Sequence, residues 1–158
     1  MSLKVLKFGG SSLADAEHFR QVAEIVKSDP TRRYVVASAP GKRNSGDSKV
    51  TDLLYKCYAL ACDEEDITEV FDEIKARYNT IIADLGIELD LTEAFEKIRF
   101  SMLHNSGRDY VASRGEYLNA MILAKYLGFD FVDAKKVVFF NEDGSFNPEK
   151  TNDVMRDA

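Results

Sequence analysis

The stretch KVLKFGGSS (residues 4–12) combines residue types that can bind an anion. Lys7 brings a positive charge to the end of a short apolar run, and Gly9 and Gly10 follow almost at once. Glycine allows positive φ and the close approach of another group. The serines that follow can cap a helix, whose first N–H groups attract negative charge. The stretch therefore predicts a seat for a small anion; the alternative is a glycine turn with Lys7 in solvent.

The loop at residues 41–48 reads G-x-x-x-x-G-D-S between a predicted strand and a predicted helix, which is close to a phosphate-binding P-loop. Asp47 stands where the P-loop lysine should be. A carboxylate there would repel the phosphates that such a loop holds. The sequence therefore argues against a P-loop and favours a flexible polar loop. Such a loop can still be functional, because ligands of open α/β sheets bind beyond the carboxyl ends of the strands.

Glu116 is a third candidate, in SRGEYLNA (residues 113–120), where it directly follows a glycine on a predicted helix. Its carboxylate could bind a cationic group or be an ordinary surface charge. His18 and His104 are isolated from each other and from the cysteines. Because metal ligands occur in clusters, we expect no metal site.

A β-α-β unit must position the first two candidates. Residues 4–8 and 33–39 read as strands, the second of them buried because its apolar run is continuous. Ser12 is the expected cap of the helix between them, with Asp15 three residues on as in a capping box. This arrangement predicts a right-handed crossover in a parallel sheet.

Helices are expected over most of the remaining chain. Gly86 and Gly128 each follow an apolar stripe with helical spacing and are expected to end a helix. Residues 130–134 and 136–140 predict two short strands, and a turn-rich loop then leads into a last helix.

Composition narrows the class of protein. The 158 residues are 45% hydrophobic, which suits one globular domain, and the net charge of −6 argues against a nucleic-acid surface. No apolar run approaches the roughly 18–20 residues that span a membrane, and we expect no secretory signal. Cys57 and Cys62 lack a zinc-ribbon spacing and predict two reduced thiols, as in the cytoplasm.

Several of these stretches together resemble the aspartokinases. Their order and rough spacing are those of KVLKFGGSS (4–12), YVVASAPG (34–41), KVTDLL (49–54) and SRGEYLN (113–119), followed by FVDA (131–134). Aspartokinases belong to the amino-acid kinase family, whose members phosphorylate small acids without a Walker P-loop. The resemblance implies an α/β fold in which a mostly parallel sheet is sandwiched by helices, with a helical insertion at about residues 63–105.

The resemblance also implies a reaction, in which ATP and L-aspartate give 4-phospho-L-aspartate and ADP. This is the first step toward lysine, threonine and methionine, with Mg²⁺ bridging the phosphates. By position, Ser38 and Thr51 would hold aspartate, and Glu116 would pair with its α-ammonium group. Lys7 would neutralise the transferring phosphoryl group as the catalytic residue. The residues expected to bind the ATP phosphates are Lys7, Phe8, Gly9, Gly10 and Ser11.

The sequence departs from the family pattern in two places, and it matches one part of the family's catalytic domain. The loop at 41–48 is long and charged, and Arg114 and Tyr117 flank the Gly-Glu pair where many relatives carry other residues. Residues 1–158 match the N-terminal, aspartate-binding part of the family, without its nucleotide-binding half and its regulatory ACT domains. We therefore expect the isolated chain to fold, to self-associate and to be inactive. For the enzyme we expect a homodimer with no nucleic-acid or membrane partner.

Two other functions remain open at this point. One is a kinase for another small acid, such as glutamate or N-acetylglutamate, and the other is a non-catalytic α/β binding module. Glu116 bears on the choice, because a free α-amino group needs an anionic partner and an N-acetylated one does not.

Overall fold

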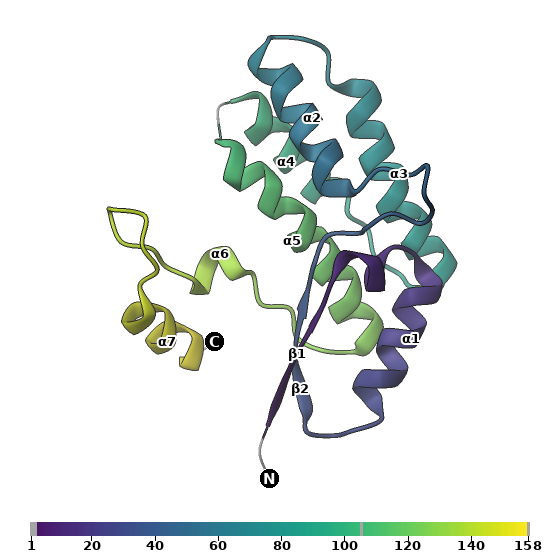
Figure 1. Ribbon diagram of the computed structural model, residues 1–158, viewed down its shortest axis with the longest axis vertical. Coiled ribbons are helices and arrows are strands. Elements are labelled where there is room, and N and C mark those ends of the chain that lie inside the picture. Colours follow the sequence, from purple (N-terminus) through teal and green to yellow (C-terminus); the bar gives the residue numbers. More distant parts are fainter. Residues whose placement is uncertain (1–2, 105, 158) are drawn as a thin grey trace.

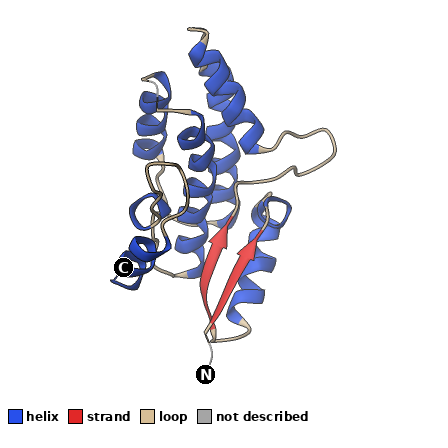
Figure 2. Ribbon diagram, turned by 60° about the vertical axis from the view of Figure 1, so that its left-hand side comes forward, coloured by secondary structure: helices blue, strands red, loops and turns tan. Residues whose placement is uncertain are grey.

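The computed structural model describes residues 3–104 and 106–157 and begins with the predicted β-α-β unit (Figure 1). Strands β1 (Lys4–Phe8) and β2 (Arg32–Ala37) are joined by helix α1 (Ala16–Lys27). The strands run parallel, as Figure 2 shows, with Phe8 opposite Ala37. The predicted α/β class with a parallel sheet is confirmed.

The start of α1 differs from the prediction. The cap is Asp15, whose carboxylate accepts a hydrogen bond from the His18 backbone N–H at 3.0 Å. Ser12 lies inside a separate 3-10 turn, η1 (Gly10–Leu13). The expected Ser12 cap is wrong because the chain makes this extra turn between strand and helix.

Four helices form a bundle, and the last of them also runs alongside the sheet (Figure 1). They are α2 (Val50–Cys62), α3 (Thr68–Leu85), α4 (Thr92–Leu103) and α5 (Arg108–Leu127). Their apolar stripes are buried together, with Tyr78, Phe71 and Leu54 among the fully buried side chains. Gly86 and Gly128 end α3 and α5 with φ of 65° and 73°. Both predicted helix ends are confirmed, and glycine suits them because positive φ strains other residues.

Among the described residues, helices cover just one of the two faces of the sheet. Leu6, Phe8 and Val35 pack against the hydrophobic core, whereas Val5, Tyr34 and Val36 are more than half exposed. The prediction that residues 33–39 are buried throughout is therefore wrong for alternate positions of β2. The apolar run is continuous, but each side chain in a strand faces the side opposite to its neighbours.

The two strands predicted at residues 130–134 and 136–140 are also absent from the described part of the chain. Asp133 instead caps a short helix, α6 (Ala134–Val137), by accepting a hydrogen bond from the Lys135 backbone N–H. Only an isolated antiparallel bridge joins Phe140 to Phe146 before α7 (Pro148–Asp157). Within the described residues these apolar positions have no neighbouring strand to pair with, and Figure 1 shows the segment extending away from the bundle.

Candidate functional site

An open cleft of about 560 Å³ lies beyond the carboxyl ends of the two strands. Its walls come from four parts of the chain: the turn after β1, the loop after β2, the start of α2, and α5. The lining residues are Gly10, Ser11, Ser38, Ala39, Pro40, Gly41, Lys42, Lys49, Thr51 and Glu116. Polar groups from segments distant in sequence thus meet where ligands of parallel α/β sheets bind.

Five of the eight predicted site residues line this cleft. Ser38 directly follows β2, Thr51 lies in the first turn of α2, and Glu116 lies on α5. Gly10 and Ser11 are the first residues of η1, and they line the same cleft as Ser38. The structure therefore brings the three predicted aspartate ligands together with part of the predicted phosphate seat.

Lys7, Phe8 and Gly9 do not line this cleft. Lys7 is exposed on β1, opposite Val36, and Phe8 borders a smaller cavity of about 310 Å³. Gly9 has an ordinary φ of −75°. The roles of these residues toward ATP stay predictions.

At the glycine turn after β1, the backbone of Gly10 lies very close to the backbone of Gly41. The Gly41 N–H donates to the Gly10 carbonyl oxygen at 2.8 Å. A Cβ atom on Gly41 would lie 2.6 Å from the Gly10 carbonyl carbon, and one on Gly10 would lie 2.9 Å from the Ala39 oxygen. Among the described residues, neither Gly9 nor Gly10 takes the positive φ that the sequence led us to expect. The close approach that we predicted is made by the chain itself.

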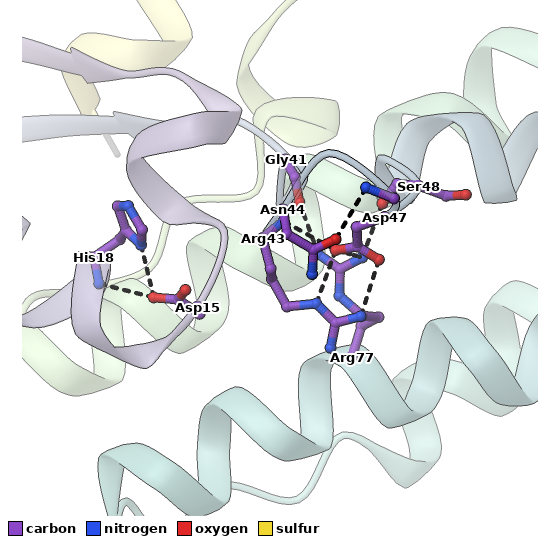
Figure 3. A network of polar contacts seen from close by, with 9 residues as sticks. Asp15, His18, Gly41, Arg43, Asn44, Asp47, Ser48 and Arg77 are labelled. Carbon is purple, nitrogen blue, oxygen red and sulfur yellow. Dashed lines mark hydrogen bonds and ion pairs between the residues drawn. The ribbon is translucent and has the colours of Figure 1, made fainter.

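The loop at residues 41–49 is anchored by a cluster of charged side chains (Figure 3). The Asp47 carboxylate accepts hydrogen bonds from Arg43 Nε at 2.8 Å and Arg43 Nη2 at 2.9 Å, and lies 3.1 Å from Arg77 Nη1. These hydrogen bonds to Arg43, with the positive charge of Arg77, hold the pKa of Asp47 well below its usual range. The carboxylate that excludes a P-loop is thus neutralised within the loop.

Arg77 reaches this loop from α3. Its side chain is only 3% exposed, and it donates to the Ser48 carbonyl oxygen at 2.9 Å and to the Gly41 carbonyl oxygen at 2.7 Å. Burial lowers the pKa of Arg77 from its usual value. A buried arginine therefore holds the loop at both of its ends, an anchor that the sequence did not indicate.

The opposite wall of the cleft is α5, which approaches the end of β2 closely at Gly115. A Cβ atom on Gly115 would lie 2.8 Å from Ala39 Cβ. The Tyr78 hydroxyl donates to the Gly115 carbonyl oxygen at 2.8 Å. Burial raises the pKa of Tyr78 well above its usual value, and the negative charge of Glu116 adds to this effect. Tyr78 is therefore a neutral hydrogen-bond donor next to the residue that precedes Glu116.

Three further residues matter here although the sequence did not single them out. Asn119 is fully buried and donates to the Ser38 carbonyl oxygen at 2.7 Å, while its Oδ1 has no hydrogen-bond donor among the described residues. Lys42 and Lys49 add positive charge to the cleft lining. Asn119 lies three residues after Glu116, a spacing that shares a helix face and could have identified it.

The histidines and cysteines lie outside the cleft lining. His18 contacts the Asp15 carboxylate at 2.7 Å, and His104 stacks on Phe100. Both cysteines are free, and burial raises the pKa of Cys57 to about 12. Within residues 3–104 and 106–157, no group of three or more His, Cys, Asp or Glu side chains is arranged to hold a metal ion. Nor is any helix in that part of the chain long and apolar enough to cross a membrane.

Comparison with known proteins identifies the family. The sequence model described as "Amino acid kinase family" matches residues 2–157, nearly the whole chain. The chain belongs to the amino acid kinase family. Within this family it is similar to aspartokinase 3 of Bacillus subtilis (strain 168), with 36% identity over 141 residues. That match covers 85% of this chain and 31% of the relative, so the chain spans about a third of that protein's length.

Solved structures agree on the amino acid kinase fold. The crystal structure of Clostridium acetobutylicum aspartate kinase matches with a TM-score of 0.95 and 44% identity, over 99% of this chain and 36% of the other. Escherichia coli aspartokinase III, in its complex with aspartate and ADP, matches with a TM-score of 0.74 over 98% of this chain and 37% of the other. At 23% identity, this second likeness supports the fold alone. The predicted fold class and the resemblance to aspartokinases are confirmed.

Proposed function

We propose that the protein is an aspartate kinase, which transfers the γ-phosphoryl group of ATP to the side-chain carboxylate of L-aspartate. The observation that carries the proposal is the convergence of Ser38, Thr51 and Glu116 on one cleft beyond the strand ends. These are the residues that the family resemblance assigns to aspartate, and they come from three separate segments: the loop after β2, the first turn of α2, and α5.

The chemistry of the cleft suits a small zwitterionic acid. Glu116 supplies the one carboxylate of the lining and binds the α-ammonium group of aspartate. The hydroxyls of Ser38 and Thr51 donate hydrogen bonds to its carboxylates, and Lys42 and Lys49 add positive charge. Hydroxyls and cations are the groups that bind carboxylates, and a carboxylate is the partner of an ammonium group.

The transfer itself needs positioning and charge neutralisation more than covalent help. An oxygen of the aspartate side-chain carboxylate attacks the γ-phosphorus, the bond from this phosphorus to the bridging oxygen of ADP breaks, and ADP leaves with that electron pair. We propose that the turn formed by Phe8, Gly9, Gly10 and Ser11 binds the phosphates through its backbone amides. Lys7 neutralises the transferring group, and Mg²⁺ enters with the nucleotide and offsets its negative charge.

The relatives support this proposal by their names. The C. acetobutylicum protein, 44% identical, is an aspartate kinase, and the B. subtilis protein is an aspartokinase. The chain spans about a third of each of these relatives, and we propose ATP binding, turnover, a homodimer and a cytoplasmic location for the whole enzyme. We propose that residues 1–158 alone do not turn over.

A coupled assay for ADP release on the full-length protein tests the proposal, with L-aspartate, L-glutamate and N-acetyl-L-glutamate as acceptors. We expect turnover with L-aspartate. Glu116→Gln keeps the shape of the side chain and removes its charge, and Glu116 is exposed in the free protein. We therefore expect a loss of about 2 kcal/mol in aspartate binding, which is roughly 30-fold in KM.

The matched control is Glu96→Gln, an exposed glutamate on α4, which should leave KM unchanged. Lys7→Ala should lower kcat by about 100-fold or more with a smaller change in KM. Faster turnover with L-glutamate or N-acetyl-L-glutamate than with L-aspartate would reassign the substrate. No turnover with any acceptor would favour a non-catalytic binding module.

A further inference from the structure

Helix α3 presents two consecutive residues to opposite walls of the candidate cleft. Arg77 contacts the loop at residues 41–49, and Tyr78 contacts α5 at Gly115. Both side chains are buried, and both donate to backbone oxygens 29 to 37 residues away in sequence. Neither residue lines the cleft, so each acts on it through another part of the chain.

Arg77 sets the position of the loop that carries the cationic side of the lining. It donates to the Gly41 oxygen, one residue before Lys42, and to the Ser48 oxygen, one residue before Lys49. Its ion pair with Asp47 adds a third point of attachment. A guanidinium group suits this place because its donors form a fixed planar fork, whereas the ammonium group of lysine is a compact point charge.

Tyr78 sets the position of the wall that carries Glu116. Its hydroxyl binds the Gly115 oxygen at 2.8 Å, and Gly115 packs against Ala39 at the end of β2. Because the phenol is fully buried and neutral, water does not compete for this hydrogen bond.

We propose that Arg77 and Tyr78 are positioning residues that fix the distance between the two walls, so that the site for an acidic amino-acid substrate is formed before the substrate binds. The proposal deepens the proposed function and rests on it. Buried donors on a packed helix hold a binding site more accurately than solvent-exposed ones, and a preformed site avoids the cost of ordering a loop on binding. The predicted helical insertion thereby gains a role in substrate recognition.

The experiment compares Arg77→Lys and Tyr78→Phe in the full-length protein, with Arg20→Lys and Tyr126→Phe as matched controls. Arg20 also donates to a backbone oxygen of α3, at Asp84, and its other partner among the described residues is Glu17 on α1 rather than a residue of the loop. Tyr126 is a half-buried tyrosine on α5 that packs near Lys27. Three measurements are made on each variant: KM and kcat for L-aspartate, the thermal midpoint, and the rate of trypsin cleavage after Lys42, Arg43 and Lys49.

We expect Arg77→Lys to raise KM for aspartate about tenfold and to speed cleavage of the loop about tenfold, with kcat within about threefold of wild type. Tyr78→Phe should raise KM about fivefold without changing cleavage of the loop, because it releases only the α5 wall. Both controls should behave as wild type.

An unchanged KM in both variants would overturn the proposal. So would a fall in the thermal midpoint without any rise in KM, since that result describes a residue that serves stability alone. Absence of aspartate turnover in the wild type would instead overturn the proposed function. In that case the trypsin rates would still decide whether Arg77 fixes the loop: equal rates in wild type and Arg77→Lys would refute it.

Discussion

Two polar loops of similar composition behave differently in this structure. The loop at residues 41–49 and the loop at residues 141–147 both combine glycine, asparagine, aspartate and serine. The first is held by Arg77, which approaches it from a different part of the chain. The second is held by its own residues: Asn141 Nδ2 donates to Ser145 Oγ at 2.9 Å, and Ser145 Oγ donates to the Asp143 carboxylate at 2.6 Å.

The difference teaches that composition does not decide whether a loop forms one wall of a site. Local hydrogen bonds by Asn, Asp and Ser give both loops their turns. Only the first loop also receives a buried charged donor, and that loop lines the cleft. A long-range contact of this kind adds stabilisation that local turns lack, and it predicts different responses to mutation.

The largest effect is expected from Arg77→Met. This change leaves Asp47 without its buried partner, and the oxygens of Gly41 and Ser48 lose the donor that reaches them from α3. Removing one member of a buried ion pair costs about 3–5 kcal/mol in the free energy of unfolding. Urea unfolding measures this cost, with Arg20→Met as the control at an exposed arginine. A loss below about 1 kcal/mol would show that the loop does not depend on Arg77.

Gly41→Ala and Gly144→Ala compare the same change in the two loops. At Gly41 the new Cβ atom would lie 2.6 Å from backbone, so the loop must move, and we expect a loss of about 3 kcal/mol and a raised KM for aspartate. Gly144 has open space around it but a φ of 81°, so alanine there should cost only about 1 kcal/mol and leave KM unchanged. Equal effects on KM would remove the distinction between the loops.

Acid should release the first loop in a defined pH range. The pKa of Asp47 lies below its value in the unfolded chain, so its contribution to stability is fully present above about pH 4 and is lost as the pH falls toward the lowered pKa. Trypsin does not act at such pH, so hydrogen exchange of residues 41–49 is the measurement. We expect exchange to speed up below about pH 4 in the wild type and to be already fast at neutral pH in Asp47→Ala. Protection that is independent of Asp47 would contradict the anchoring role of this carboxylate.

The smallest effect is expected from Asp143→Ala in the second loop. Asp143 accepts hydrogen bonds from the Ser145 hydroxyl and N–H, and these bonds hold the pKa of Asp143 below its usual value. The site is exposed, so the change should alter the free energy of unfolding by less than about 0.5 kcal/mol. Urea unfolding of the Asp143→Ala and Asp47→Ala variants side by side is the test, and a larger loss at Asp143 would reverse the comparison.

The isolated chain offers a separate test of the sheet. Val5, Tyr34 and Val36 are exposed on one face of the two strands, and exposed apolar strands favour self-association. We expect residues 1–158 to self-associate in solution, and Tyr34→Lys to weaken this association by placing a charge on that face. Sedimentation at several concentrations would show it; a monomer at all concentrations would contradict the expectation.

The sequence by itself determined the elements whose signal is local. Apolar residues at helical spacing are sufficient to place α1 and the bundle helices, and Gly86 and Gly128 end helices because positive φ is easy for glycine. Ser38 and Thr51 could be placed at one edge of the sheet because the end of a strand and the start of a helix are also local signals. Their roles toward aspartate and ATP remain predictions from the family resemblance.

Only the tertiary structure decided which of these elements have partners. Residues 130–140 carry an apolar pattern typical of strands, but a strand needs a neighbour, and here Asp133 caps a helix instead. Asp47 pairs with Arg77, which lies 30 residues further along the chain and reaches the loop from α3. Pairings of this kind depend on how α3 packs against the strand ends, because burial in a shared core brings together donors and acceptors whose sequence separation carries no signal.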